Sequence, residues 1–124
     1  MDTTAFKKAY GESRNGASHF IRHGLVRSFQ YSDGVGECAD AGCHWLVDIA
    51  ATELPALMRR AGAPSAFLEV HVESGKADLK LTVEDDAPPL WKRDIDYTDM
   101  PDGDYTFELA DESDRVAMIL ISEH

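Results

Sequence analysis

The feature that most constrains the fold is a strict alternation of aliphatic and polar side chains over residues 68–73 and again over residues 78–83. Such a period of two is typical of strands with one buried face. The aliphatic positions are Leu68, Val70, Val72, Leu79, Leu81 and Val83. Ser74-Gly75 stands between the runs and is typical of a tight turn. The sequence therefore predicts an antiparallel hairpin with one apolar face.

Further strands are predicted on both sides of this hairpin. Residues 19–31 indicate a bent strand or a hairpin interrupted by a glycine, and residues 90–97 indicate a strand with Tyr97 among its inward side chains. Tyr105, Phe107 and Leu109 alternate with polar residues in the next strand. Residues 115–122 are apolar on both faces, so this strand is expected to be central or covered on both sides.

The helical signals are concentrated in the first half of the chain. Residues 2–10 predict a short helix, and Ser32-Asp33 resembles a helix cap, with Asp33 as the favoured capping residue. The main helix is predicted at residues 43–54, where apolar residues recur on one face. Pro55 is expected to bend this helix or to start a further turn.

Together these elements predict an α+β fold, an antiparallel β-sheet of about five strands packed against one main helix. A chain of 124 residues with 44% hydrophobic residues is sufficient for a single domain over residues 1–124. The N-terminal residues have no apolar run suited to a signal peptide, so a cytoplasmic protein with reduced cysteines is expected.

The charge of the chain is divided unevenly between its two parts. Residues 1–65 carry seven acidic and seven basic side chains, whereas sixteen acidic and five basic side chains follow and account for the net charge of −11. Such a surface repels nucleic acid and anionic membranes and attracts basic partners. The candidate partner-binding residues are Glu84, Asp85, Asp86, Asp94, Asp96, Asp99, Asp102, Asp104, Asp111, Glu112 and Asp114, with Trp91 or Tyr105 as aromatic anchors.

A second interpretation is a small enzyme or ligand-binding domain with a pocket between helix and sheet near His23, Cys43, His44 and Asp48. A thiol beside an imidazole and a carboxylate can form an activated nucleophile. Adjacent residues on a helix point away from each other, however, so Cys43 and His44 cannot pair directly. We therefore expect no catalytic residues.

Zinc ligands of the right chemical type are also present, at His19, His23, Cys38, Cys43 and His44. Their spacing does not match a zinc site, because Cys38 and Cys43 are separated by four residues rather than two. No metal and no other cofactor is therefore expected.

A set of short motifs extends over nearly the whole chain. They are Phe6 with Gly11, Phe20-Ile21-Arg22-His23, Arg27, Tyr31-Ser32-Asp33-Gly34-Val35, Trp45-Leu46-Val47-Asp48, Tyr97-Thr98-Asp99-Met100-Pro101 and Ile121-Ser122-Glu123-His124. In this order the chain resembles a family of small uncharacterised proteins, a domain of unknown function encoded by bacteria, their phages and mobile elements. The resemblance implies an accessory protein of a mobile element and brings no established activity.

Charge and resemblance together predict a small non-enzymatic protein of a phage or mobile element. It is expected to bind and inhibit a basic nucleic-acid-handling host complex, as an anti-CRISPR or other anti-defence protein, through charge mimicry of nucleic acid. Direct binding to nucleic acid or to membranes is not expected. A further alternative is a homodimer or larger homo-oligomer joined through sheet edges.

Overall fold

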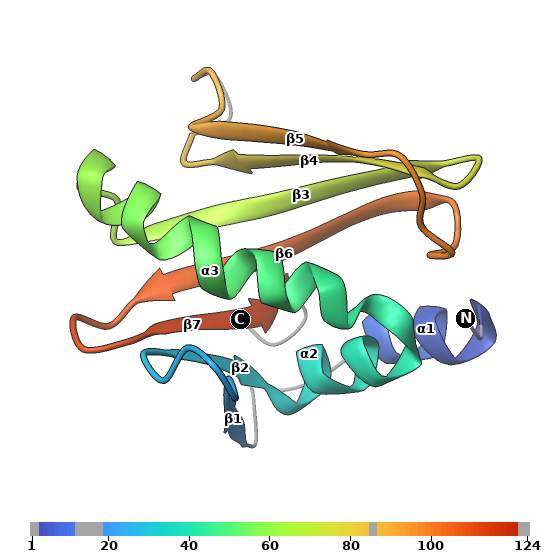
Figure 1. The fold of residues 1–124 in the computed structure, drawn as a ribbon, viewed down its shortest axis with the longest axis horizontal. Coiled ribbons are helices and arrows are strands. Elements are labelled where there is room, and N and C mark those ends of the chain that lie inside the picture. The colour runs from blue at the N-terminus through green and yellow to red at the C-terminus, as the bar shows by residue number, and fades with distance from the viewer. Residues whose placement is uncertain (1–2, 12–18, 85–86, 122–124) are drawn as a thin grey trace.

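The computed structural model describes residues 3–11, 19–84 and 87–121, and in this part of the chain it shows an α+β fold with a seven-stranded mixed sheet (Figure 1). The sheet order is β1-β2-β7-β6-β3-β4-β5. The strands are β1 (Phe20–Arg22), β2 (Phe29–Ser32), β3 (Ser65–Glu73), β4 (Lys76–Thr82), β5 (Trp91–Ile95), β6 (Gly103–Asp111) and β7 (Val116–Leu120). The helical segments are α1 (Thr3–Gly11), α2 (Asp33–Cys38), the π-helical turn η1 (Ala39–Cys43) and α3 (His44–Ala61).

The alternating residues form the predicted hairpin of β3 and β4. Ser74 and Gly75 have φ angles of 52° and 79°. Two successive residues with positive φ make a tight turn whose twist matches that of the strands. The aliphatic side chains of β3 and β4 are buried and the alternating polar ones are partly or fully exposed. The prediction for this region is confirmed except at Val83, which follows the end of β4 and is exposed.

Helix α3 crosses one face of the sheet, and α1 and α2 lie toward one end of it (Figure 1). The helix is longer than predicted, because it continues through Pro55 to Ala61. A proline inside a helix removes one backbone hydrogen bond. Leu54 and Met58, on either side of Pro55, are both fully buried, so their packing favours continuing the helix. At Gly62 the chain turns left-handed, with φ 66°, and the helix ends.

Ser32, not Asp33, caps helix α2. The backbone N–H of Val35 donates to Ser32 Oγ at 3.1 Å, whereas Asp33 Oδ1 accepts from the N–H of the next residue, Gly34. The prediction that Asp33 is the cap is therefore wrong by one position. An N-cap side chain reaches the N–H two or three residues later, and Asp33 already lies in the first helical turn.

The count of about five strands was too low, and the sheet is not purely antiparallel. Residues 20–32 form the β1–β2 hairpin, and β2 then pairs with β7 in parallel, with Phe29 opposite Val116. Three-residue and four-residue strands are too short to show a period of their own. The expected central position of the last strand is confirmed, because β7 lies between β2 and β6.

Aromatic packing attaches α1 to the helix-covered face. Phe6 and Tyr10 contact the ring of Tyr105 edge-on, at centroid distances of 5.1 and 5.0 Å. Such edge-on contacts are favourable beyond the area that they bury. The backbone N–H of Thr106 also donates to the Tyr10 hydroxyl at 2.9 Å. None of the helices in the described residues combines the length and hydropathy that a membrane span requires.

Candidate functional site

The face of the sheet turned away from α3 is charged, and its charges form two rows that cross four strands. The strand register places these residues side by side on β6, β3, β4 and β5. The acidic row consists of Asp104, His71, Asp78 and Asp94. The lysine row consists of Thr106, Glu69, Lys80 and Lys92. Neighbouring strands lie about 4.8 Å apart, so adjacent members of a row are within reach of one another.

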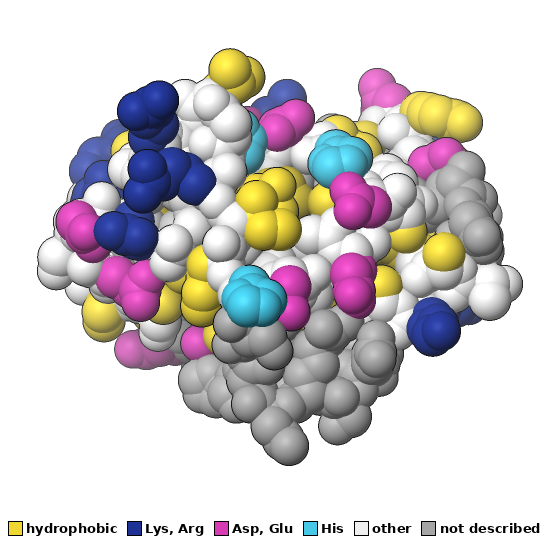
Figure 2. Space-filling model, turned by 90° about the horizontal axis from the view of Figure 1, so that it is seen from below, with side chains coloured by type: hydrophobic (Ala, Val, Ile, Leu, Met, Phe, Trp, Pro, Cys, Tyr) yellow, Lys and Arg dark blue, Asp and Glu magenta, His cyan; other side chains and the backbone are white. Residues whose placement is uncertain are grey.

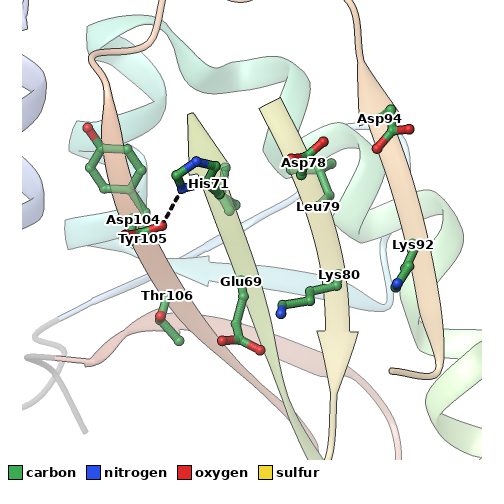
Figure 3. A pocket seen from close by; sticks show the side chains of 11 residues that line it. Glu69, His71, Asp78, Leu79, Lys80, Lys92, Asp94, Asp104, Tyr105 and Thr106 are labelled. Carbon is green, nitrogen blue, oxygen red and sulfur yellow. Dashed lines mark hydrogen bonds and ion pairs between the residues drawn. The ribbon is translucent and has the colours of Figure 1, made fainter. Parts of the chain in front are cut away.

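Both rows line a shallow groove of about 600 Å³, which Figure 3 shows from close by. The side chains of the acidic row lie along one part of the groove and those of the lysine row along the other (Figure 3). Leu79 and Tyr105 also line the groove, although their side chains are buried on the helix side of the sheet. The groove therefore has a charged surface and no exposed apolar floor.

His71 is the one member of the acidic row that can carry a positive charge. Its Nδ1 lies 2.6 Å from Asp104 Oδ1, and its Nε2 lies 3.6 Å from Glu73 Oε2. The hydrogen bonds to Asp104 and Glu73 raise the pKa of the imidazole above its ordinary value, because both carboxylates favour the protonated ring. His71 is therefore protonated over a wider pH range than an isolated histidine.

Charges of the same sign face each other within each row. Asp78 lies directly opposite Asp94, and Lys80 lies directly opposite Lys92. Like charges in direct cross-strand positions destabilise a sheet. Within the part of the chain that the structure describes, none of these four side chains has a hydrogen bond or ion pair to another residue. For these four side chains, opposite charges are met along their own strands, where Asp78 and Lys80 are two positions apart, and across to β3, where Asp78 faces His71 and Lys80 faces Glu69.

A second group of carboxylates lies at the end of the sheet where the β3–β4 turn meets the connection between β5 and β6. We call this group the acidic end; it consists of Glu73, Asp94, Asp96, Asp99, Asp102 and Asp104. Two hydrogen bonds hold the two segments together, from Ser74 N–H to Asp102 Oδ1 at 3.1 Å and from Thr98 N–H to the Gly75 carbonyl at 2.8 Å.

The acidic end also presents an exposed aromatic ring, which sequence reasoning placed wrongly. Tyr97 is 79% exposed, because β5 ends at Ile95 and the chain leaves the sheet before Tyr97. The prediction that Tyr97 points inward is therefore wrong. Tyr105, expected as an anchor, is buried and donates its hydroxyl to the Pro101 carbonyl at 2.7 Å. Trp91 is half-buried against the core.

The remaining acidic candidates lie at the opposite end of the sheet. Asp111 is the last residue of β6, Glu112 and Asp114 belong to the β6–β7 turn, and Glu84 follows β4. Asp111 pairs with Arg59 at 3.4 Å, and Asp114 pairs with Arg115 at 3.1 Å. Glu112 accepts a hydrogen bond from Gln30 at 3.2 Å. Asp85 and Asp86 lie outside the described residues.

The two ends of the molecule therefore differ in charge balance. Seen from below, the Lys and Arg side chains gather toward the left end (Figure 2). This is the end at which the last turn of α3 and the β6–β7 turn lie in Figure 1. The acidic side chains there have basic neighbours, and among the described strand residues of the acidic end His71 and Lys76 are the basic ones that lie directly opposite its carboxylates. The eleven predicted acids are not one continuous patch.

The histidine and cysteine candidates form no catalytic arrangement around a cavity. His23 Nε2 lies 2.8 Å from Asp48 Oδ1, while its Nδ1 accepts the backbone N–H groups of Leu25 and Val26 at 3.1 and 3.0 Å. Nδ1 therefore carries the lone pair and Nε2 the proton. Because the turn before β2 occupies that lone pair, His23 is not free to accept a proton from a substrate.

Cys43 and His44 have separate environments. The Cys43 thiol is buried, and burial together with the nearby Cys38 raises its pKa, so the reactive thiolate is disfavoured. His44 is exposed and its Nε2 lies 3.3 Å from Asp40 Oδ1, one helical turn earlier. Neither the groove nor a second hollow between α1 and η1 is lined by His23, Cys43, His44 or Asp48.

In the described ranges, no three His, Cys, Asp or Glu side chains are grouped as a metal site would require. His19 is exposed and directly precedes β1, and the two cysteines are buried.

The chain is thus a small α+β domain with one face of its sheet covered by helices and with two charged rows on the other face, over β6, β3, β4 and β5. It belongs to the family of unknown function DUF6876, whose model matches residues 8–124. The resemblance to a domain of unknown function is thereby confirmed. The chain is also similar to the crystal structure of a protein of unknown function from Enterococcus faecalis, with 19% sequence identity, coverage of 86% of this chain and 98% of that chain, and a TM-score of 0.48. No curated protein matches the chain.

Proposed function

We propose that this protein is a non-enzymatic binding protein whose acidic end docks on the basic surface of a nucleic-acid-handling host protein. The observation that carries the proposal is the exposed ring of Tyr97 on the β5–β6 connection, the segment that also bears Asp96, Asp99 and Asp102. A large aromatic side chain surrounded by charge is typical of the centre of a binding surface, where the ring is buried by the partner.

The charge of the acidic end determines the kind of partner. Carboxylates held close together on two joined loops favour Lys- and Arg-rich surfaces, and they accelerate encounter with such surfaces at low salt. The working surfaces of proteins that bind nucleic acid are basic, because they neutralise phosphates. A protein that covers such a surface inhibits by charge mimicry. The proposed role is that of a cytoplasmic anti-defence protein of a phage or mobile element, such as an anti-CRISPR protein.

The test is affinity capture from a lysate of the source organism at low salt with three baits. The first is the wild type, and the second carries Asp96→Asn, Asp99→Asn and Asp102→Asn. The matched control removes the same number of charges at the opposite end, through Asp111→Asn, Glu112→Gln and Asp114→Asn. We expect the wild type and the control to capture the same nucleic-acid-binding protein and the second bait to lose it.

Tyr97→Ala tests the anchor separately, with the captured partner purified. Removing a central aromatic ring should weaken the complex by about 2 kcal/mol, roughly a thirtyfold rise in Kd measured by calorimetry. Capture that is unchanged in the triple Asp→Asn variant, or retained at high salt, would contradict the proposal. Melting temperatures of all baits show whether any of them is unfolded.

A further inference from the structure

The two charged rows on the open face are complementary to each other, position by position. On β6, Asp104 of the acidic row and Thr106 of the lysine row are two residues apart. On β3, the same holds for His71 and Glu69. On β4, Asp78 of the acidic row and Lys80 of the lysine row are two residues apart, and on β5 the same holds for Asp94 and Lys92. Each member of the acidic row therefore has on its own strand, two residues away, a side chain of opposite charge or a hydrogen-bonding group. This pattern extends over the four strands and depends on their register.

We propose that a second copy of this chain docks on this face, with the acidic row of each copy on the lysine row of the other. A two-fold axis that lies between the rows and runs parallel to them exchanges the two rows. The contact is then isologous, since both copies use the same surface. Asp78 meets the partner copy's Lys80, and Asp94 meets the partner copy's Lys92. The strands of the two sheets are aligned, as in sheets that pack face to face.

The charge distribution within one copy favours this occupant. Asp78 and Asp94 repel each other across β4 and β5, and so do Lys80 and Lys92. In the dimer, each of these side chains gains an opposite charge in front of it, and the charges alternate across the interface. His71, whose charge is stabilised by Asp104 and Glu73, meets the partner copy's Glu69. A partner with charges of one sign would match only one of the two rows.

The interaction is expected to be reversible and sensitive to salt. All the groups involved are at the surface in one copy, so each ion pair is weak by itself and the sum over the rows carries the contact. At an ionic strength of 0.1 M the Debye length is about 10 Å, and interactions between exposed charges weaken further as salt is added. The dimer goes beyond the proposed function and does not depend on it, since Tyr97 and the loop carboxylates that carry the proposed function lie outside the rows.

The test is a charge exchange measured by sedimentation velocity at low salt. One variant carries Lys80→Glu and Lys92→Glu, and the other carries Asp78→Lys and Asp94→Lys. Each variant alone places like charges against like and should be monomeric. An equimolar mixture should form a heterodimer, because the two reversed rows then meet each other and the two unchanged rows meet each other, with opposite signs in both contacts. The wild type should form dimers that weaken at least roughly tenfold when salt rises from about 0.05 to about 0.5 M.

A control variant separates docking on this face from attraction between net charges. Arg59→Glu with Arg60→Glu makes the same change in net charge on α3 and leaves both rows intact. This variant should still dimerise with itself, but it should form no heterodimer with the Asp78→Lys, Asp94→Lys variant, whose reversed row meets an unchanged lysine row. The milder Lys80→Gln, Lys92→Gln variant should also lose the dimer. It serves as a control in case the charge-reversed variants misfold. A monomeric wild type at millimolar concentration would overturn the proposal, and so would a dimer that survives Lys80→Glu with Lys92→Glu.

Discussion

His71 connects the acidic row to the acidic end, and its two carboxylate partners make its contribution to stability depend on pH. The folded-state pKa is raised above 6.5 by Asp104 and Glu73, so the folded protein binds this proton more tightly than the unfolded chain. The stabilisation is therefore fully present below about pH 6.5 and is lost as pH rises through the folded pKa.

Replacing His71 with Gln should accordingly destabilise the protein at pH 6 and have little effect at pH 9. The urea midpoints of the wild type and the variant, measured at several pH values, provide the comparison. Because His71 is exposed, the difference should shrink in high salt. A difference in midpoint that is the same at every pH would show that the imidazole acts through packing or shape, and not through its charge.

Single residues were predicted well where burial repeats and poorly where a strand ends. Tyr105, Phe107 and Leu109 are buried as expected, because each is enclosed in a regular alternation. Tyr97 follows the same alternation in sequence, but β5 stops two residues before it. The sequence has no signal for that end, since the pairing of β5 with β4 is a long-range property. The ring that distinguishes the acidic end was therefore missed.

At the level of elements, the end of α3 depends on a glycine with a left-handed backbone. Gly62 has φ 66°, and its N–H donates to the Arg59 carbonyl at 3.1 Å while the Ala63 N–H donates to the Met58 carbonyl at 2.9 Å. A Cβ at Gly62 would meet no other atom within 4 Å. The effect of a substitution there is thus a matter of backbone conformation alone.

Gly62→Ala should lower the free energy of unfolding by about 1 kcal/mol, since a left-handed conformation costs roughly this much for a residue with Cβ. Gly24→Ala is the matched control, because a Cβ there also meets nothing within 4 Å and its φ is not in the left-handed region. Urea denaturation at one pH measures both. Equal effects of the two substitutions would mean that Gly62 is not required by its φ angle.

Elements with a local pattern were predictable, and the candidate site was not. The β3–β4 hairpin follows from alternation and from a turn of two residues. The acidic row and the lysine row also need β6 beside β3 and β5 beside β4, in one particular register. A shift of one residue in either pairing would turn the side chains to the other face. The sequence shows many acids in this half, but the register decides which of them lie side by side in one row.

On the scale of the whole molecule, strand β7 joins the two halves of the chain. It pairs with β2 on one side and with β6 on the other, and its residue Met118 is fully buried between Tyr31 and Leu109. A strand shared in this way couples the helical part to the hairpin part. We therefore expect the described fold to unfold as one cooperative unit.

Met118→Ala should lower the free energy of unfolding by about 2–5 kcal/mol, since it leaves a cavity in the core. Trp45 on α3 and Trp91 on β5 lie in different parts of the molecule, so single Trp→Phe variants allow each to be followed by fluorescence. Both signals and the circular dichroism should change at the same denaturant concentration, with or without the Met118 substitution. Separate transitions for the two tryptophans would contradict coupling through β7.

The parallel pairing of β2 with β7 also has a consequence for the order of folding. Gln30 and Arg115, which are hydrogen-bonded across this pairing, are 85 positions apart in the sequence. Closing so long a loop costs entropy before any contact is gained, and pairings between distant segments slow folding. The pairing of the β1–β2 hairpin with β7 is therefore expected to form late in folding. Until it forms, the neighbouring edges of β2 and β7 are unpaired. Unpaired strand edges favour aggregation, so we expect the folding chain to be most prone to aggregate before this pairing forms. The refolding yield at high concentration should then depend on the rate at which β2 pairs with β7.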